Sequence, residues 1–183
     1  MTDVSSCQRC EICTGHPVPG DGPLNAEIMF IGEAPGFHEE QTGHPFVGQS
    51  GLVLDELLSL IGLTREQVFI DNVVKCRPPN NRDPKPEEIQ NCAEWLQESI
   101  NTVKPKVVVT LGRFAAAQFF PTDKMGTIHG TTCIIDGVTY YAMYHPAATL
   151  YNSPLLKVLQ QDILRLPAII EGHSEQVTEI DLF

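Results

Sequence analysis

Short apolar runs alternate with amphipathic stretches along this chain, and each kind of pattern predicts one kind of element. Apolar residues dominate Ala26–Ile31, Gln67–Val74 and Val107–Leu111, as in strands that are buried on both faces. Leucine and isoleucine recur at helical spacing in Gly51–Leu63, and a second helix begins at Pro86, where proline loses no needed donor. Strands separated by helices in this way predict a parallel sheet covered by helices.

The C-terminal part of the chain adds one antiparallel unit to this pattern. An alanine-rich helix is expected over Arg113–Phe120, and a last helix over about Pro154–Leu166. Between them, Thr131–Met143 predicts a hairpin that turns at an Asp-Gly pair, which is typical of tight hairpin turns. We therefore expect a single-domain, three-layer α/β sandwich with a mainly parallel central sheet over residues 1–170, followed by an acidic, flexible tail over residues 171–183.

Three unusual loops follow predicted strands. The loop GEAPG follows the first strand, DNVVK closes the second, and YHPA follows the hairpin. Ligands of such sheets bind beyond the carboxyl ends of the strands. The three loops are therefore expected to meet at one crevice.

The chain is strongly acidic, with a formal net charge of −11. Such a charge argues against nucleic acid, whose phosphates are normally met by Lys and Arg. The distribution changes this picture, because residues 65–113 hold eight of the twelve basic residues against seven acidic ones, a net of +1 that leaves −12 for the rest. The candidates for a local basic face, as opposed to an ordinary solvated surface, are Arg77, Arg82, Lys85, Lys104 and Lys106.

Neither a membrane segment nor a secretory segment is predicted. No apolar stretch approaches the roughly 20 residues that a membrane helix needs, and the N-terminus has no apolar core of a signal peptide. We expect a cytoplasmic monomer. In the cytoplasm, six cysteines suggest metal ligation more than disulfides.

Four cysteines lie in two separated pairs. Cys7 and Cys10 are spaced as C-x2-C, while Cys76 follows a predicted strand and Cys92 lies 16 residues later on a predicted helix. Thiolates in such a set hold a zinc ion or an iron–sulfur cluster, and spacing alone does not separate the two. A shifted pair that ends at Cys13 is an alternative, and the one remaining cysteine fits a core position in the hairpin better.

Taken together, these cysteines and the stretches GEAPGFHEEQTGHPFVG, DNVVKCRPPNNR and HPA resemble the family 4 uracil-DNA glycosylases, the iron–sulfur branch of that superfamily. The resemblance runs from about Cys7 to Leu166, nearly the whole expected domain. It implies the uracil-DNA glycosylase fold and a DNA repair enzyme that flips uracil out of DNA and hydrolyses its N-glycosidic bond, leaving an abasic site. It also favours a 4Fe–4S cluster over zinc as the cofactor.

The same resemblance implies a set of site residues. Asn72 would read uracil, because its amide offers the donor and acceptor that match O4 and N3–H. His145 would hydrogen-bond O2 and stabilise the negative charge of the leaving base, and Glu33 would position water or stabilise the cationic sugar. The catalytic residues implied are Glu33, Asn72 and His145; the substrate-binding residues implied are Ala34, Pro35, Gly36, Glu39, Phe46, Asn72, Asn81, His145 and Leu150; the cluster ligands implied are Cys7, Cys10, Cys76 and Cys92.

Several of these residues also have a plainer interpretation. Phe46 matches the aromatic residue that stacks on the base, but taken alone it fits a core position. Glu39 matches an acid that crowds the C5 edge of uracil and excludes the methyl group of thymine, or else it lies on an ordinary loop surface. Ala34 stands where other glycosylase families place a catalytic Asp, so a strong general base is missing there.

Two motifs depart from the family pattern. Where the family often reads HPSYLLR, this chain reads HPAATLYN, so Leu150 is kept as a wedge for the duplex but the expected Arg is absent. His129 and Gly130 stand where many members have Arg-Gly. Both departures predict weaker contacts with phosphates, in keeping with the acidic balance. The sequence leaves the choice between single- and double-stranded DNA open.

Other functions are compatible with parts of this pattern. A non-catalytic iron–sulfur DNA-binding module on the same scaffold would lose Asn72 or His145, and both are present. A covalent uracil-trapping relative would carry a basic, His-containing insertion, which is not seen between Cys92 and His145. A zinc-dependent or Cys–His hydrolase would need an open metal position or a free thiol beside His, whereas all four of these cysteines are already taken as ligands of the cluster. A glycosylase is therefore favoured.

The chain ends in EIDLF, which resembles the peptides that bind the bacterial sliding clamp, usually QLSLF or QLDLF. Leu182 and Phe183 would fill an apolar pocket on the clamp, and Ile180 would cover a neighbouring groove. Glu179 in place of Gln weakens the match, and a frayed tail is the alternative. Besides uracil-containing DNA, the clamp is thus a candidate partner, through Glu179, Ile180, Asp181, Leu182 and Phe183.

Overall fold

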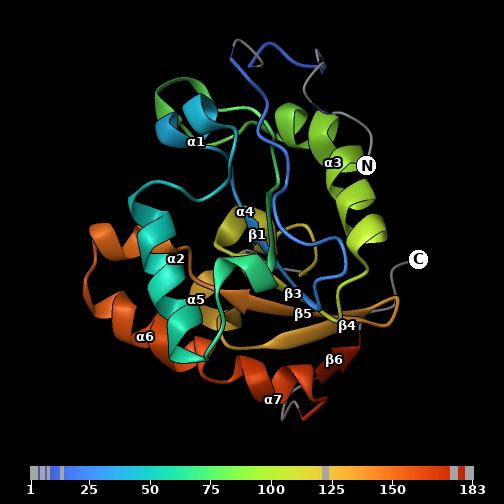
Figure 1. Cartoon of the computed structure of the whole chain (residues 1–183), viewed down its shortest axis with the longest axis vertical. Helices are drawn as coiled ribbons and strands as arrows, with labels where there is room; N and C mark the ends of the chain where they lie inside the picture. The colour runs from blue at the N-terminus through green and yellow to red at the C-terminus, as the bar shows by residue number, and fades with distance from the viewer. Residues whose placement is uncertain are drawn as a thin grey trace.

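The computed structural model describes residues 4, 7, 9–12, 15–120 and 124–173, and the backbone of 177–179. Across these residues, six strands form one sheet in the order β2-β1-β3-β5-β4-β6 (Figure 1). The strands are β1 (Ile28–Gly32), β2 (Phe69–Asn72), β3 (Val107–Leu111), β4 (Thr132–Ile135), β5 (Val138–Met143) and β6 (Val177–Glu179).

The sheet is mainly parallel. β1 pairs in parallel with β2 and with β3, and β3 pairs in parallel with β5. β4 runs antiparallel to β5, because the two form the predicted hairpin. Asp136 and Gly137 have φ values of 51° and 79°, as the two central residues of a type I′ turn require. At the edge, β6 pairs in parallel with β4 and brings part of the acidic tail to the sheet.

Helices cover both faces of the sheet (Figure 1). Alternate residues of a strand enter different cores: Met29 and Ile31 of β1 face one, and Ile28 and Phe30 face the other. Residues of α3, α4 and α5 close the first core, and residues of α2, α6 and α7 close the second. The helices are α1 (Phe37–Thr42), α2 (Gln49–Leu60), α3 (Pro86–Val103), α4 (Arg113–Ala116), α5 (Met125–Ile128), α6 (Pro154–Ile163) and α7 (Leu166–Ile170), with 3-10 turns η2 (Arg65–Gln67), η3 (Pro79–Asn81) and η4 (Pro146–Leu150).

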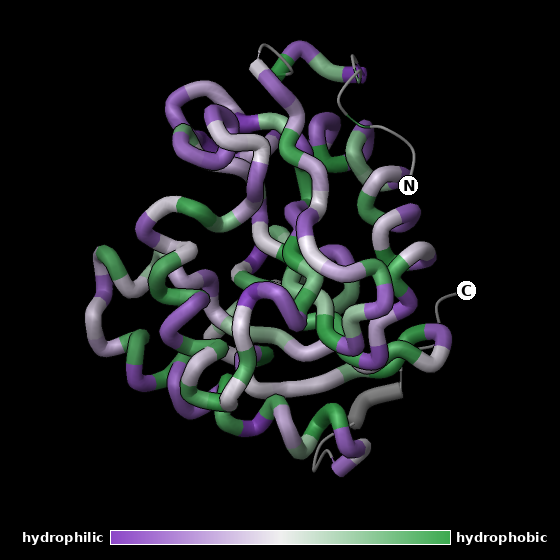
Figure 2. The backbone as a smooth tube through the Cα atoms, in the orientation of Figure 1, coloured by the Kyte–Doolittle hydropathy of each residue, from purple (hydrophilic) through white to green (hydrophobic). Residues whose placement is uncertain are grey.

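The hydropathy of the chain follows these layers. Figure 2 shows α3 alternating between hydrophobic and hydrophilic positions, as a helix with one buried side does. Its residues Cys92, Leu96, Ile100 and Val103 are buried in the first core. The predicted three-layer α/β sandwich is confirmed. Within the described ranges, no helix is long and apolar enough to span a bilayer.

Two predicted helices differ from the structure. The helix expected over Arg113–Phe120 is α-helical only to Ala116 and continues as turns. The last helix, expected to run unbroken to Leu166, ends at Ile163 and is followed by the separate α7. Pro167 has no N–H with which to bond the Ile163 carbonyl, so the helix breaks where that bond is lost.

Candidate active site

Three polar side chains stand at the carboxyl ends of strands, as the loop positions predicted. Glu33 follows β1, Asn72 ends β2 and His145 follows β5. A cleft of about 410 Å³ opens at this edge of the sheet. Its lining consists of Glu33, Ala34, Pro35, Gly36, Glu39, Ser50, Pro78, Asn81, Arg82, His145, Ala147, Ala148 and Tyr151. Most of the predicted substrate-binding residues are therefore in one cleft, while Phe46, Asn72 and Leu150 are not part of this lining.

Asn72 and Phe46 meet beside Gly32, the last residue of β1. A Cβ at Gly32 would stand 2.5 Å from both the Asn72 side-chain oxygen and the Phe46 ring, so only glycine allows this approach. Phe46 in turn stacks on His145, with 5.5 Å between the ring centroids and 24° between the ring planes. The fold thus joins Asn72 and Phe46 to the wall of the cleft through His145.

The Asn72 amide is buried and incompletely paired. The residue is 2% exposed, and its side-chain oxygen has no hydrogen-bond partner among the described residues. Leaving a buried polar atom without a partner costs stability, and a ligand that brings a donor would supply the missing partner. The ring N–H of a nucleobase is a donor of this kind.

Sequence reasoning missed the ion pair that supports Asn72. Asp71 and Lys75 pair with each other, and both side chains are buried. The Asp71 carboxylate also accepts the Asn72 N–H at 2.8 Å, and the Lys75 ammonium donates to the Asn72 carbonyl at 2.9 Å. The signal was present in DNVVK, where two opposite charges four residues apart interrupt an apolar strand end.

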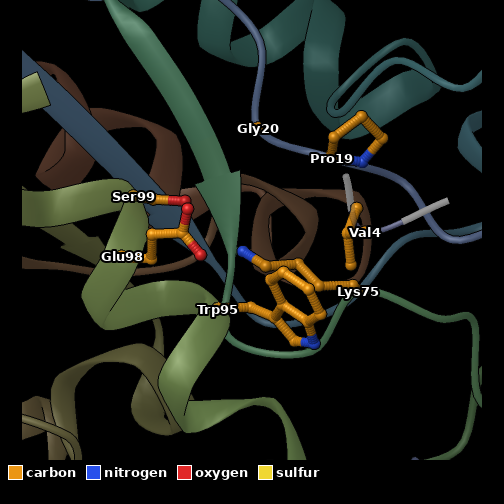
Figure 3. Close-up of a pocket in the computed structure, with 7 residues that line it drawn as sticks. All are labelled: Val4, Pro19, Gly20, Lys75, Trp95, Glu98 and Ser99. Atoms are coloured by element: carbon orange, nitrogen blue, oxygen red, sulfur yellow. The ribbon is translucent and has the colours of Figure 1, made fainter. Parts of the chain in front are cut away.

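Lys75 lines a small pocket that is separate from the cleft. Figure 3 shows its side chain between Trp95 and Ser99, two residues of α3. The pocket holds about 10 Å³, which is space for roughly one water molecule. The ammonium group therefore serves the backbone at the end of β2 and not the cleft.

His145 is half-buried in the wall of the cleft. The surrounding protein desolvates its imidazole and lowers the pKa to about 4, against a weaker opposite effect of the Glu39 charge. Its Nδ1 accepts the Ala147 N–H at 3.1 Å, so the single proton of the neutral ring lies on Nε2. Gly112, with φ at 85°, leaves room for this ring, because a Cβ there would stand 2.9 Å from the His145 Cβ. The neutral His145 imidazole can thus donate its Nε2–H to a ligand in the cleft.

Glu33 carries a carboxyl group whose pKa lies near neutrality. Burial is the largest cause of the raised pKa of Glu33, and the negative charge of Asp83 raises it further, while the positive charge of Arg113 lowers it. Together they raise the pKa of Glu33 to about 7. Carboxyl groups with such a pKa, placed in a cleft, are candidates for proton transfer or for charge stabilisation that switches with pH.

Glu39 is buried and joins the two ends of the stretch GEAPGFHEEQTGHPFVG. Its carboxylate accepts the N–H groups of Gly36 at 3.1 Å, Val47 at 3.0 Å and Gly48 at 2.9 Å. It is therefore not part of an exposed loop surface. These bonds hold the turn around Phe46, whose φ of 54° is unusual for a large side chain. The exclusion of thymine by Glu39 stays a prediction.

The residues predicted as a basic face are mostly paired with acids. Four of the five have an acidic partner, and the pairs are Arg77–Glu40, Arg82–Glu88, Lys85–Glu87 and Lys106–Glu27. Arg77 also donates to the Asn81 side-chain oxygen at 2.7 Å, which ties the Pro-rich loop to itself. Contact with a phosphate would have to compete with these pairs.

The predicted cluster ligands come from three parts of the chain. Cys76 and Cys92 are buried, and Cys7 and Cys10 are half-buried. Cys7, Cys10 and Cys92 carry thiol groups, whereas Cys76 is disulfide-bonded, so this structure does not show Cys76 as a free ligand. The pKa of the Cys92 thiol is raised, mainly by burial, and the charges of Cys10 and Cys7 add to it, so the N-terminal pair lies near Cys92. A backbone hydrogen bond from Lys75 also reaches Cys92. Over the part of the chain that the structure describes, no three His, Cys, Asp or Glu side chains are grouped closely enough to hold a metal ion.

Two further cysteines, Cys133 and Cys13, complete the six of the chain. Cys133 is buried in the first core, where burial raises the pKa of its thiol to about 11, as suits a core cysteine. Cys13, the alternative ligand, lies outside the described residues.

Known proteins are similar to this chain in sequence. Residues 19–164 match the sequence model of the Uracil DNA glycosylase superfamily. The chain is 43% identical to the type-4 uracil-DNA glycosylase of Saccharolobus solfataricus, over 99% of this chain and 88% of that protein. It is 43% identical to the type-4 uracil-DNA glycosylase of Sulfurisphaera tokodaii, over 90% and 80%, and 41% identical to that of Archaeoglobus fulgidus, over 91% and 89%. The chain therefore belongs to the uracil DNA glycosylase superfamily, in its type-4 branch.

Proposed function

We propose that the protein is a monofunctional uracil-DNA glycosylase that works in DNA repair as a monomer. It flips uracil out of DNA and hydrolyses the N-glycosidic bond, leaving an abasic site. The observation that carries this proposal is the buried Asn72 amide, whose unpaired oxygen lies beside the Phe46 ring. An acceptor next to an aromatic face fits the edge and the plane of a base.

The direct test uses an oligonucleotide with a single uracil. Alkali applied after incubation cleaves the strand wherever an abasic site has formed. Breaks are expected only after alkali, because no lysine is among the described residues that line the cleft, and a lyase step needs an amine nucleophile. An uncut strand would contradict the glycosylase, and breaks before alkali would contradict its monofunctional character.

Asn72 distinguishes uracil from cytosine by the polarity of its amide. The unpaired oxygen accepts the N3–H of uracil, while the amide nitrogen donates to O4. Cytosine presents an acceptor at N3 and a donor at N4, so both contacts would meet like groups. Phe46 provides the face on which the flipped base stacks.

His145 and Glu33 divide the charges that bond cleavage creates. As the bond breaks, negative charge develops on the base and positive charge on the sugar. His145 donates its Nε2–H to uracil O2, and the Ala147 N–H holds the ring ready for this contact. Glu33 in its ionised form stabilises the cationic sugar or orients the attacking water.

Excision is expected to decline as pH falls through about 7, the pKa of Glu33. Above that pH the carboxylate is ionised and acts, and below it the group is protonated and neutral. Asp83→Asn removes a charge that raises this pKa, so the acidic limb of the profile should move to lower pH. Arg113→Met removes a charge that lowers it, so the limb should move to higher pH.

The measurement is kcat/KM against pH for the wild type and these two variants. Opposite shifts support the role of Glu33, and the two substitutions control for each other because both disrupt the same Asp83–Arg113 ion pair. Shifts in the same direction, or a limb that neither variant moves, would show that another group sets the profile.

We further propose that the cysteine set Cys7, Cys10, Cys76 and Cys92 binds a 4Fe–4S cluster. Cys7, Cys10 and Cys92 carry thiol groups, and with Cys76 in its reduced form, which suits the cytoplasm, the set supplies the four thiolates that such a cluster takes. Zinc accepts the same donors and is the alternative. A cluster there would crosslink the N-terminal arm to α3, and the hydrolysis requires no redox step from it.

Protein prepared without oxygen is expected to be brown and to contain about four iron atoms per chain. Cys92→Ala should lose this iron, whereas Cys133→Ala, a change at the core cysteine, should keep it. Metal analysis of the three proteins decides between the alternatives, because zinc in place of iron in the wild type would overturn the cluster.

The replicative sliding clamp is our proposed protein partner. Glu179 ends β6, while Ile180–Phe183 lie outside the described residues, so this proposal rests on the sequence EIDLF. Binding would raise the local concentration of an acidic enzyme at newly made DNA. In calorimetric titrations with the cognate clamp, truncation after Thr178 should abolish binding, and so should the double change of Leu182 and Phe183 to Ala, which keeps β6. Unaltered binding by these variants, or none by the full chain, would refute the partner.

A further inference from the structure

Large apolar side chains stand exposed around the mouth of the cleft. Tyr151 lines the cleft and is 91% exposed. Its neighbour Leu150 is 50% exposed, and Phe37, which follows the cleft residue Gly36, is 51% exposed. Exposed apolar groups gathered beside a binding cleft mark an interaction surface.

The segment that carries Tyr151 is firmly supported. It closes the turn η4, which packs against α2 and α6. The Tyr151 N–H donates to the Ala148 carbonyl at 3.4 Å, and the Asn152 N–H donates to the same carbonyl at 2.9 Å. Since η4 begins directly after His145, the backbone of Tyr151 is held at a set place relative to the catalytic imidazole, and its exposed ring is available to a ligand.

The arginines nearest the cleft are committed to acidic partners. Arg82 lines the cleft and binds Glu88 through two nitrogens, at 2.9 and 2.6 Å. Arg77 pairs with Glu40 and Arg113 with Asp83, and each of the other arginines of the chain also has an acidic partner. A phosphate must compete with such a partner for the cation, so each contact adds less to affinity than a contact with an unpaired arginine would. Stacking on bases is an additional source of affinity that this surface offers.

We propose that Tyr151 is a stacking platform for the base next to the flipped uracil, and that the enzyme therefore prefers uracil in single-stranded DNA. The inference rests on the proposed glycosylase function. An aromatic ring accepts any base, because every base has a π face. In a duplex the neighbouring base is already paired and stacked, and releasing it costs free energy. In a single strand that base is free to move onto the ring.

The first experiment compares kcat/KM on one uracil oligonucleotide, alone and annealed to its complement. The wild type should favour the single strand. Tyr151→Ala should lower kcat/KM on the single strand about tenfold, in line with the usual contribution of one base stacked on an aromatic side chain. Tyr151→Phe should keep the wild-type value, because the ring stacks and the hydroxyl does not.

A matched control separates stacking from general surface effects. Leu164 is also exposed, at 58%, and does not line the cleft, so Leu164→Ala should leave kcat/KM unchanged. The high exposure of Tyr151 means that its substitution removes little packing. Equal unfolding midpoints of all variants are the accompanying check.

The second experiment keeps the Tyr151 ring and removes the neighbouring base that is expected to stack on it. Single strands are made with an abasic linker on one side of uracil or on the other. One of the two linkers should lower kcat/KM of the wild type about tenfold, whereas it should not lower kcat/KM of Tyr151→Ala any further. Binding to a strand with 2′-fluoro-2′-deoxyuridine, which resists hydrolysis, should show a salt slope shallower than about −2, equivalent to fewer than roughly three phosphate contacts.

The outcomes distinguish this inference from the function on which it rests. Faster excision from the duplex than from the single strand, or equal values for Tyr151→Ala and the wild type, overturns the platform and leaves the glycosylase intact. Failure of the wild type to excise uracil from either substrate overturns the glycosylase and the platform together.

Discussion

Replacing His145 by alanine is expected to slow uracil excision about 10²–10³-fold, the usual cost of removing one donor that stabilises a developing negative charge. The loss should appear in kcat, because the donor matters most when the base carries its full charge. The imidazole is neutral with a pKa of about 4, so the variant should be slower by the same factor across the neutral range. Single-turnover rates measured over that range check the prediction.

The shape of the pH profile is the internal control for His145→Ala. The acidic limb near pH 7 belongs to Glu33 and should survive the substitution. If the limb disappeared together with His145, the histidine itself would titrate there, and the neutral donor would be wrong. An unchanged rate would remove His145 from the site altogether.

Asn72→Asp is expected to reduce the preference for uracil over cytosine about 10²–10⁴-fold. Burial favours the neutral, protonated form of the introduced carboxyl, which then offers an O–H donor and a carbonyl acceptor. That pair can be arranged to match cytosine. One matched pair of contacts to a base edge gives about 1–3 kcal/mol of discrimination, and here one pair is lost while another is gained. The ratio of kcat/KM on the two bases, in the same oligonucleotide, measures the effect.

Asn72→Ala is the matched control for this change. It removes both contacts and supplies no new ones, so excision of uracil should fall without any gain on cytosine. Both variants should keep the Asp71–Lys75 pair, which bonds only the backbone of Asn72. Equal preference for uracil in the wild type and in Asn72→Asp would mean that another group reads the base.

The order of the elements and the edge of the sheet that carries the site could be predicted from the sequence. Hydrophobic periodicity is a local property, and it located β1, β2 and β3 because each of these strands is buried along its whole length, while the Asp-Gly turn located the hairpin. Parallel strands place their carboxyl ends together, so the loops after Gly32, Asn72 and Met143 had to share one edge. The family motifs then named the residues, and the cleft contains most of them.

The boundaries of two helices followed from bonds that periodicity does not report. The apolar pattern of the last helix continues past Ile163, yet Pro167 removes the hydrogen bond that would carry the helix on. The orientation of Lys75 could not be predicted either, because the charges in DNVVK do not show on which side of the strand end its side chain lies. Only the packing of α3 shows that Lys75 turns away from the cleft and supports Asn72 from behind.

Taken by itself, then, the sequence determined the fold class, the edge of the sheet that holds the site, and part of the set of residues there, which did not include Tyr151. The tertiary structure decided their chemical states. The pKa of Glu33 depends first on its burial and then on Asp83 and Arg113, which lie 50 and 80 residues further along the chain, and that of His145 depends on how much protein surrounds it. The pairing of the arginines, which leaves Tyr151 as the prominent group at the mouth, is equally a result of long-range contacts. Electrostatic energies depend on distance and burial in space, and sequence separation reports neither.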